Sequence, residues 1–260
     1  SFEGNWGWDG TLRYHGVQAS ETLINGGTLR HTGPSNAATN GGAGRLFTVG
    51  TAGATLDSAT AGAEFRIGYR YDYSTSLTSQ GGTLILTGAG NGDLSYILPG
   101  SGGLVKSGGG RWSLRQPNTY SGATTVNAGT LALFETFSSP SCSIASGAVL
   151  ELNTSSGSRD YRTVSFSGAG TLRKSGANAA SWGAAASTFG MASGSLIDVT
   201  AGTFTGGSNA NEVWTNNRSD LNVAATASFV GAEANVRVDA LNGAGTISSG
   251  STDASYASFT

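Results

Sequence analysis

The sequence predicts an all-β protein built as a parallel β-helix, and three observations lead to this prediction. Short runs of alternating apolar residues, too short for helices, are separated by clusters of Gly, Ser, Pro and Asn that are typical of turns. A glycine followed by a β-former and an aliphatic residue returns along the whole chain. The 260 residues include 42 Gly, only 4 Pro and 12% charged residues, so solubility comes mostly from hydroxyls and amides.

The recurring triplet Gly-Thr-Leu sets the expected size of one coil. It occurs at residues 10–12, 27–29, 82–84, 129–131 and 170–172. Its anchors, together with those of weaker copies, follow one another at intervals of about two dozen residues, enough for three short strands and their turns. We expect about ten coils, with all anchors stacked in one apolar ladder. The anchors are Leu12, Leu29, Leu56, Leu84, Val105, Leu131, Leu150, Leu172, Phe204, Phe229 and Ile247.

The segment from Gly102 to Leu133 carries the most regular pattern, and a fragment of it recurs at residues 168–176. Its characteristic residues are Lys106, Leu114, Asn118, Tyr120, Gly122, Thr124, Val126, Gly129 and Leu131. They resemble the autotransporter-associated β-strand repeat of secreted bacterial β-helical passengers, from which the segment departs at Trp112. The resemblance covers about one eighth of the chain. It implies a right-handed β-helix and a secreted or cell-surface bacterial protein. It supports a fold without specifying an activity.

We expect one elongated domain over residues 1–247. Residues 1–15 are predicted to form an N-terminal cap that plugs the open end of the solenoid, with ligand stacking as the alternative for their rings. Residues 248–260 are either a last strand or the start of a linker. The aromatic and histidine residues of the predicted cap are Phe2, Trp6, Trp8, Tyr14 and His15.

Charge and composition argue against several partners. The 14 Lys and Arg are scattered among 16 Asp and Glu with no basic stripe, which argues against nucleic acid. We found neither an apolar run long enough to cross a membrane nor a signal peptide, and the chain does not begin with Met. We therefore expect a module excised from a larger exported protein. We also expect it to be a monomer. The single cysteine, Cys142, is predicted to be a buried apolar residue. No cofactor or metal is expected.

In six coils, an aromatic residue follows the anchor after a comparable number of residues. Outward rings would form a wall that repeats at the strand spacing of about 4.8 Å and suits an extended polysaccharide. Inward rings would be ordinary core stacks, and both alternatives stay open. Trp112 is assigned to the core because it shares a strand face with Leu114. The six rings are Tyr71, Tyr96, Tyr120, Tyr161, Trp182 and Trp214.

Polar residues cluster around three of these rings, and that mixture is typical of neutral sugar recognition. Rings cover the C–H faces of a sugar, while guanidinium, amide and carboxylate groups bind its hydroxyls. Further companions are Arg159, Asp160, Arg162, Glu212 and Asn217. The predicted carbohydrate-binding residues are Arg66, Arg70, Tyr71, Asp72, Tyr161, Trp182, Trp214, Asn216 and Arg218.

An enzyme is the less favoured interpretation. A glycosidase needs two facing carboxylates, and the carboxylates of this chain are isolated in sequence. Glu212 with Glu233, or Asp198 with Asp220, could still meet on adjacent coils. His15 and His31 could also be neighbours, but further zinc ligands are not evident.

The sequence therefore predicts a non-catalytic module that binds xylan or a related plant cell-wall β-glycan. It resembles, in architecture and surface composition only, the β-helical carbohydrate-binding modules of bacterial xylanases. As in those proteins, we expect it to be linked to a catalytic or surface module. The alternative is a cell-surface adhesin or passenger stalk, and a β-helical polysaccharide lyase or hydrolase comes third.

Overall fold

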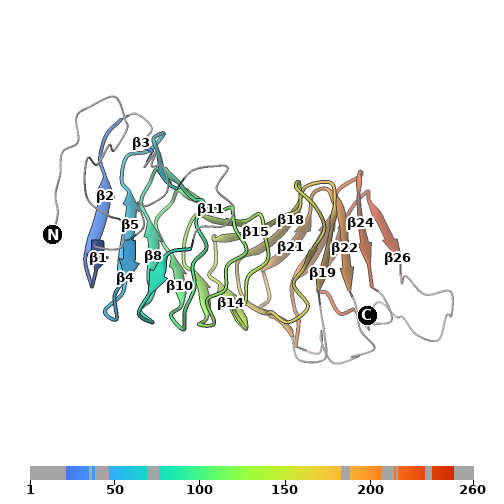
Figure 1. Cartoon of the computed structure of the whole chain (residues 1–260). Helices are drawn as coiled ribbons and strands as arrows, with labels where there is room; N and C mark the ends of the chain where they lie inside the picture. Colours follow the sequence, from blue (N-terminus) through green and yellow to red (C-terminus); the bar gives the residue numbers. More distant parts are fainter. Residues whose placement is uncertain are drawn as a thin grey trace. The chain divides into compact units, whose positions relative to one another are not determined.

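The structure is a computed structural model that describes residues 22–34, 37–38, 47–68, 76–182, 188–206, 214, 216–231 and 236–248. Within these ranges all helical or extended elements are β-strands, with no helix, and the strands pair in parallel. The chain divides into two compact units, residues 1–132 and 133–260. Successive coils follow one another through each unit (Figure 1). The prediction of an all-β parallel β-helix is confirmed.

In the first unit, neighbouring strands of a sheet come from successive coils. We name each sheet by its outermost strands in that unit. The β2–β12 sheet holds β2 (Thr28–His31), β5 (Ala54–Ser58), β8 (Leu84–Thr87), β10 (Leu104–Lys106) and β12 (Thr124–Val126); the β3–β13 sheet holds β3 (Ala37–Ala38), β6 (Glu64–Ile67), β9 (Asn91–Leu94), β11 (Arg111–Leu114) and β13 (Thr130–Leu133); and the β1–β7 sheet holds β1 (Thr22–Ile24), β4 (Phe47–Val49) and β7 (Thr78–Ser79).

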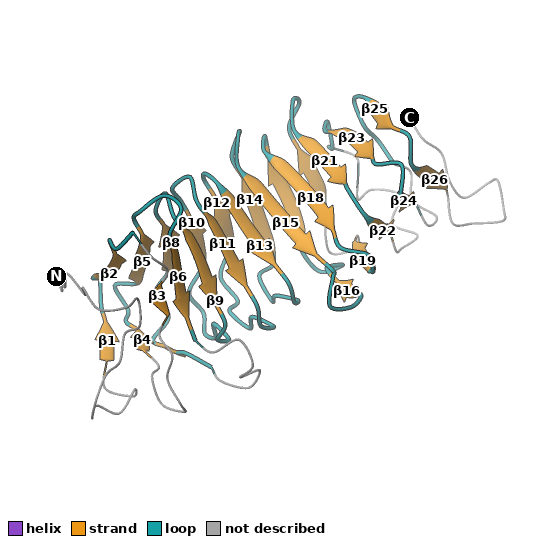
Figure 2. Cartoon of the chain, turned by 90° about the horizontal axis from the view of Figure 1, so that it is seen from above, coloured by secondary structure: helices purple, strands orange, loops and turns teal. Residues whose placement is uncertain are grey.

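The second unit repeats this plan, and Figure 2 shows its strands side by side. The β14–β20 sheet holds β14 (Ser141–Ile144), β17 (Ser165–Gly168) and β20 (Phe189–Met191); the β15–β25 sheet holds β15 (Val149–Asn153), β18 (Thr171–Ser175), β21 (Leu196–Val199), β23 (Asp220–Val223) and β25 (Leu241–Gly243); and the β16–β26 sheet holds β16 (Arg159–Asp160), β19 (Ala179–Trp182), β22 (Gly202–Gly206), β24 (Ala227–Val230) and β26 (Thr246–Ser248).

The number of coils agrees with the prediction of about ten. The β3–β13 sheet and the β15–β25 sheet each contain five described strands, one from each successive coil. Parallel strands cannot be joined by tight hairpins, so the chain must travel once around the solenoid before it returns to the same sheet. That route accounts for the interval of about two dozen residues between repeats.

Inward side chains of successive coils lie directly opposite one another. In the β2–β12 sheet, Leu56 is opposite Leu86, Leu86 is opposite Lys106, and Lys106 is opposite Val126. All four are fully buried. Because side chains alternate between the two faces of a strand, the residues between them point outward. The core of the unit is therefore a set of rows that run from coil to coil.

The prediction of a single ladder of anchors is wrong. Leu29, Leu56 and Leu84 lie in the β2–β12 sheet, whereas Leu131 lies in the β3–β13 sheet. Val105 is half-buried and lies on the outer face. In the second unit, the anchors at 150 and 172 lie in the β15–β25 sheet and those at 204, 229 and 247 lie in the β16–β26 sheet. The described Gly-Thr-Leu copies each mark a turn followed by a strand, and those strands belong to more than one sheet.

Glycine is required where the coils approach most closely. A Cβ atom at Gly110 would lie 1.8 Å from the carbonyl oxygen of Gly90 on the preceding coil. A Cβ at Gly92 would lie 2.3 Å from the ring of Trp112, which is opposite Gly92 in the sheet. By contrast, a Cβ at Gly109 would meet nothing within 4 Å. The close stacking of coils therefore explains why Gly110 and Gly92 are glycines, whereas at Gly109 stacking leaves room for a side chain.

Candidate functional site

The tryptophans predicted to bind sugar in the second unit point into its core. Trp182 and Trp214 each expose 1% of their surface. Their ring centroids lie 4.7 Å apart, edge to face, and Trp214 stacks on Phe189 at 4.6 Å. The rings of Phe204 and Phe229 each lie 5.8 Å from Trp182. These five rings form the aromatic core of the unit, so the alternative of an exposed stacking wall is wrong for Trp182 and Trp214.

The described rings of the first unit are also internal. Tyr96 and Tyr120 expose 3% and 0% of their surface, and Trp112 exposes 0%. The hydroxyl of Tyr120 lies 2.7 Å from Oγ1 of Thr124, and the indole Nε1 of Trp112 donates to the carbonyl oxygen of Thr87 at 2.9 Å. The polar atoms of Tyr120 and Trp112 thus have partners inside the unit. The assignment of Trp112 to the core is confirmed.

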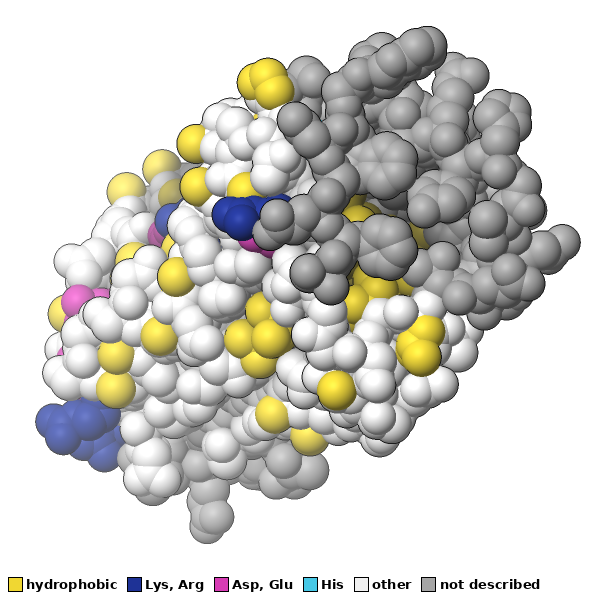
Figure 3. All heavy atoms as spheres, turned by 90° about the vertical axis from the view of Figure 1, so that its left-hand side faces the viewer, with side chains coloured by type: hydrophobic (Ala, Val, Ile, Leu, Met, Phe, Trp, Pro, Cys, Tyr) yellow, Lys and Arg dark blue, Asp and Glu magenta, His cyan; other side chains and the backbone are white. Residues whose placement is uncertain are grey.

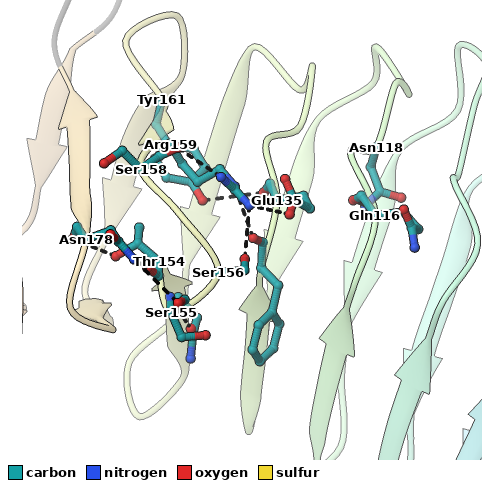
Figure 4. A network of polar contacts seen from close by, with 12 residues as sticks. Gln116, Asn118, Glu135, Thr154, Ser155, Ser156, Ser158, Arg159, Tyr161 and Asn178 are labelled. Atoms are coloured by element: carbon teal, nitrogen blue, oxygen red, sulfur yellow. Dashed lines mark hydrogen bonds and ion pairs between the residues drawn. The ribbon is translucent and has the colours of Figure 1, made fainter. Parts of the chain in front are cut away.

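Tyr161 and Arg159, near the start of the second unit, close a corner between adjacent coils. The Arg159 guanidinium pairs with the carboxylate of Glu135 and donates to Oγ of Ser156 at 3.0 Å and to the carbonyl of Phe134 at 3.2 Å (Figure 4). Tyr161 is 1% exposed, its hydroxyl donates to the Glu135 carbonyl at 3.4 Å, and burial raises its pKa. Tyr161 therefore does not present its ring to a sugar.

Asp160 and Arg162 form an exposed ion pair beside that corner. Nη2 of Arg162 lies 2.7 Å from Oδ2 of Asp160, and about half of each side chain is exposed. The hydrogen bond from Arg162 lowers the pKa of the Asp160 carboxyl. An exposed pair of this kind contributes little to stability.

The remaining predicted site residues do not form one cluster. Arg66 lies in the first unit on β6, with Nη2 2.5 Å from the Glu64 carboxylate. Asn216 and Arg218 lie in the second unit and are exposed, and Nε of Arg218 is 3.9 Å from Asp239. Their role in binding sugar stays a prediction. The other predicted members of this site and their companion, Arg70, Tyr71, Asp72 and Glu212, lie outside the described residues.

Two buried lysines close corners in the same way in the two units. The ammonium of Lys106 donates to the carbonyl oxygens of Ser107, Gly108 and Ala128 at 2.8, 2.8 and 2.9 Å. Lys106 exposes 0% of its surface, and burial lowers its pKa to about 8. The third carbonyl belongs to the next coil, so the side chain ties the turn after β10 to that coil.

Lys174 repeats this arrangement in the second unit. Its ammonium donates to the carbonyls of Ser175, Gly176 and Ala201 at 3.0, 2.8 and 2.8 Å. It is 1% exposed, and burial lowers its pKa to about 8. Both lysines belong to the sequence Lys-Ser-Gly. The repeated motif thus identifies a structural corner, because its charged group is used by backbone carbonyls.

Buried amides tie other corners together. In the first unit, Oδ1 of Asn118 accepts from the backbone N–H of Leu98 at 2.9 Å, which belongs to the preceding coil. In the second unit, Nδ2 of Asn217 donates to the carbonyl of Arg237 at 2.8 Å and to Oγ of Ser219 at 2.9 Å. Both amides are buried. Asn217, expected to accompany a sugar-binding ring, is therefore a structural residue.

The outer face of the β15–β25 sheet carries a row of paired polar residues. Glu151, Arg173, Asp198 and Asn222 lie opposite one another on successive strands. Nε of Arg173 donates to Oδ2 of Asp198 at 3.0 Å, and Nδ2 of Asn222 donates to Oδ1 of Asp198 at 2.8 Å. Ser175 donates to Glu151 at 2.7 Å. These groups satisfy one another across the strands.

The outer face of the β2–β12 sheet has a different character. Its central row consists of Thr28, Thr55, Ile85, Val105 and Thr125, each opposite the next. We call these five residues the β-branched row. Thr28 is exposed and the other four are half-buried, as expected for outward residues of a sheet. Sequence reasoning missed this row because its members are about two dozen residues apart and belong to different local patterns.

Among the described residues, the acidic and histidine residues that could have met on adjacent coils are not paired. Asp198 is opposite Asn222, and Asp220 is opposite Leu196, so the two carboxylates are not aligned as a pair. In the described ranges no group of three or more His, Cys, Asp or Glu could hold a metal ion. His31 packs beside Phe65 with ring centroids 5.7 Å apart. Glu212, Glu233 and His15 lie outside the described residues.

Three further observations concern the rest of the chain. Cys142 is buried as predicted, and burial raises the pKa of its thiol. Figure 3 views one side of the molecule, where small separate groups of hydrophobic side chains lie among polar and backbone atoms. In the part of the chain that the structure describes, no helix is long and apolar enough to cross a membrane.

The comparison with known families adds one finding to this geometry. Residues 104–133 match the family model of the passenger-associated-transport-repeat. The matched segment runs from the first residue of β10 to the last residue of β13. It agrees with the resemblance of this segment to the autotransporter-associated β-strand repeat and with the parallel solenoid. No curated protein and no solved structure matches the chain.

Proposed function

We propose that this chain is a segment of a secreted or surface-exposed bacterial passenger, in which the solenoid is an extended scaffold. The observation that carries this proposal is the match of residues 104–133 to a repeat associated with passengers and their transport. It covers two successive coils, from β10 to β13. The other described coils follow the same plan of parallel strands, so the proposed scaffold role extends to them.

The roles of the repeat residues support a scaffold. Lys106 joins three backbone carbonyls, Asn118 binds the backbone of Leu98, and Tyr120 bonds Thr124 inside the core. Each of these contacts holds coils together or fills the interior, where no external partner reaches them. In a solenoid each coil contacts mainly its neighbours, so such a structure can be extended by adding coils without a new core.

Surface display tests this proposal. The chain would be fused to an outer-membrane translocation unit, and its exposure would be measured by protease digestion of intact cells. We expect the wild-type chain to be cleaved from the surface. Gly110→Ala should reduce display several-fold, because its Cβ would meet the Gly90 carbonyl. Gly109→Ala is the matched control, since its Cβ meets nothing within 4 Å.

Two results would contradict the proposal. A wild-type chain that stays inside the cell while a known passenger is displayed by the same unit would exclude an exported segment. Equal display of the Gly110→Ala and Gly109→Ala chains, with Gly110→Ala shown to be unfolded by circular dichroism, would exclude a need for the solenoid.

We further propose that the scaffold is not an enzyme. The carboxylates of Asp57, Asp93, Glu135 and Asp198 each lie beside an arginine, which is typical of structural pairing. Among the described members of the predicted carbohydrate site, Asn216 and Arg218 are exposed. Titration of the purified chain with soluble xylan, β-glucan and pectin, together with an assay for new reducing ends or unsaturated products, tests for both binding and catalysis. Binding would restore the module interpretation, and products would establish an enzyme.

A further inference from the structure

We propose that the β-branched row on the outer face of the β2–β12 sheet binds ice. The row consists of Thr28, Thr55, Ile85, Val105 and Thr125, as defined above. This inference goes beyond the proposed scaffold function and does not depend on export of the chain. It rests on the spacing, the rigidity and the charge of this face.

The spacing is set by the backbone. Each member of the row is opposite the next on the adjacent parallel strand. Neighbouring strands lie about 4.8 Å apart, so the five side chains repeat at that distance over about 19 Å. This repeat is close to the spacing of oxygen atoms along the prism face of hexagonal ice. A crystal surface, unlike a folded partner, offers the same group again at each step of such a row.

The side chains of the row are held in fixed positions. Thr, Ile and Val carry two heavy atoms on Cβ, which restricts rotation about χ1. On the inner face, Leu56, Leu86 and Lys106 are fully buried and hold the strands from below. Methyl and hydroxyl groups on such a strand lose little conformational entropy when they meet an ordered surface. The row is therefore pre-organised for a lattice.

The chemistry of the row suits ordered water. Three threonine hydroxyls can donate to and accept from water, while all five residues present methyl groups that bind no water strongly. A charged side chain would instead impose its own hydration. The flanking residues Thr83, Thr87 and Ser107 are uncharged. Arg30 and Asp57, at the N-terminal end of the face, form an ion pair with Nε and Oδ2 2.9 Å apart.

Other partners fit this face less well. A stable protein interface buries about 800 Å² on each partner, far more than one row of five side chains provides. A flat polysaccharide is usually bound by exposed aromatic rings, and the described tryptophans of this chain are buried. The outer face of the β15–β25 sheet, with Arg173 paired to Asp198, has the charges that the β-branched row lacks.

Partition into slowly growing ice tests the proposal with the purified chain. Ice is grown on a cold surface from a dilute solution, and the fraction of protein in the ice is compared with that of a non-binding protein of similar mass. The wild-type chain should be enriched several-fold over this reference. Val105→Lys and Thr125→Lys should each fall to the reference level. Ile85→Thr combined with Val105→Thr should be incorporated at least as well as wild type.

Thr171→Lys is the matched control, because Thr171 is half-buried on the outer face of the β15–β25 sheet and β18 already carries an outward Arg173. It should partition like wild type. All variants are checked for an unchanged circular dichroism spectrum, and two lysine variants ensure that one folded test exists. The proposal is overturned if wild type is excluded from ice like the reference, or if the folded lysine variants equal wild type. Loss of incorporation into ice by Thr171→Lys would also overturn it. So would a wild-type dimer that dissociates in the Val105→Lys and Thr125→Lys variants, because the face would then be an interface between copies.

Discussion

The two units build one backbone plan around different cores. In the first, Trp112 lies over Gly92 and its indole N–H bonds the Thr87 carbonyl. In the second, Trp182 and Trp214 pack with three phenylalanines, and among the described residues neither indole nitrogen has a hydrogen-bond partner. A buried unpaired donor costs about 1–3 kcal/mol. Trp182 and Trp214 are therefore held by packing, without an indole hydrogen bond to another described residue.

Removal of a tryptophan should have the largest effect in either core. Trp112→Ala and Trp182→Ala should each lower the free energy of unfolding by about 3–5 kcal/mol, because a large buried side chain leaves a cavity. Urea unfolding followed by circular dichroism measures the change. Ser143→Ala is the control, since Ser143 is exposed on an outer face, and it should change stability by less than about 0.5 kcal/mol. A loss below about 1 kcal/mol in either tryptophan variant would show that its ring is not packed as described.

The glycine beneath Trp112 should give the next largest effect. Gly92→Ala should cost about 1–3 kcal/mol, because the added Cβ would lie 2.3 Å from the indole ring. In a Trp112→Leu background the same substitution should cost clearly less, since the smaller side chain leaves room for the methyl group. A double-mutant cycle by urea unfolding measures this coupling. Equal costs in both backgrounds would mean that backbone conformation, and not the ring, requires the glycine.

Replacement of each tryptophan by phenylalanine separates hydrogen bonding from packing. Trp112→Phe should cost about 1 kcal/mol more than Trp182→Phe, because only the former loses a hydrogen bond. Trp182→Phe also removes a buried unpaired donor, which offsets part of its lost packing. Thermal unfolding of both variants under one set of conditions gives the comparison. A larger cost for Trp182→Phe would indicate that its N–H is bound to an ordered water in solution.

The smallest change in the free energy of unfolding is expected at the corner lysines, Lys106 and Lys174. Their hydrogen bonds to backbone carbonyls offset part of the cost of burial. Burial lowers the pKa of Lys106 and of Lys174 from 10.5 to about 8. Between about pH 8 and 10.5 the unfolded chain holds protons that the folded chain has released, so stability should rise with pH in this window. Lys106→Met and Lys174→Met should each reduce that rise. Urea midpoints measured from pH 7.5 to 10.5 test this, and unchanged slopes would contradict it.

The fold could be predicted because its signals are local. Gly-Thr-Leu marks a turn followed by a strand at each of its described copies, and Lys-Ser-Gly marks two corners that the structure builds with the same carbonyl contacts. Strand length, turn composition and the interval between repeats are read directly from consecutive residues. The position of Trp112 in the core followed from alternation along one strand, which needs no knowledge of the neighbouring coils.

The candidate surfaces could not be predicted in the same way. Tyr161 and Trp214 have polar neighbours in sequence, yet the folded chain turns both rings inward. A shift of one residue moves a side chain from one face of a strand to the other. The interval between anchors varies along the chain, so spacing alone does not settle which face a distant ring occupies.

The sequence by itself determined that this chain is a parallel solenoid with glycine turns and buried repeat residues, because these features depend on neighbours within one coil. The tertiary structure decided which residues share a face. Thr55, Ile85 and Val105 become one row only when three coils stack in register. Arg173 and Asp198 pair for the same reason. Surfaces of a solenoid arise between coils, so their chemistry is fixed by register, which local sequence patterns do not contain.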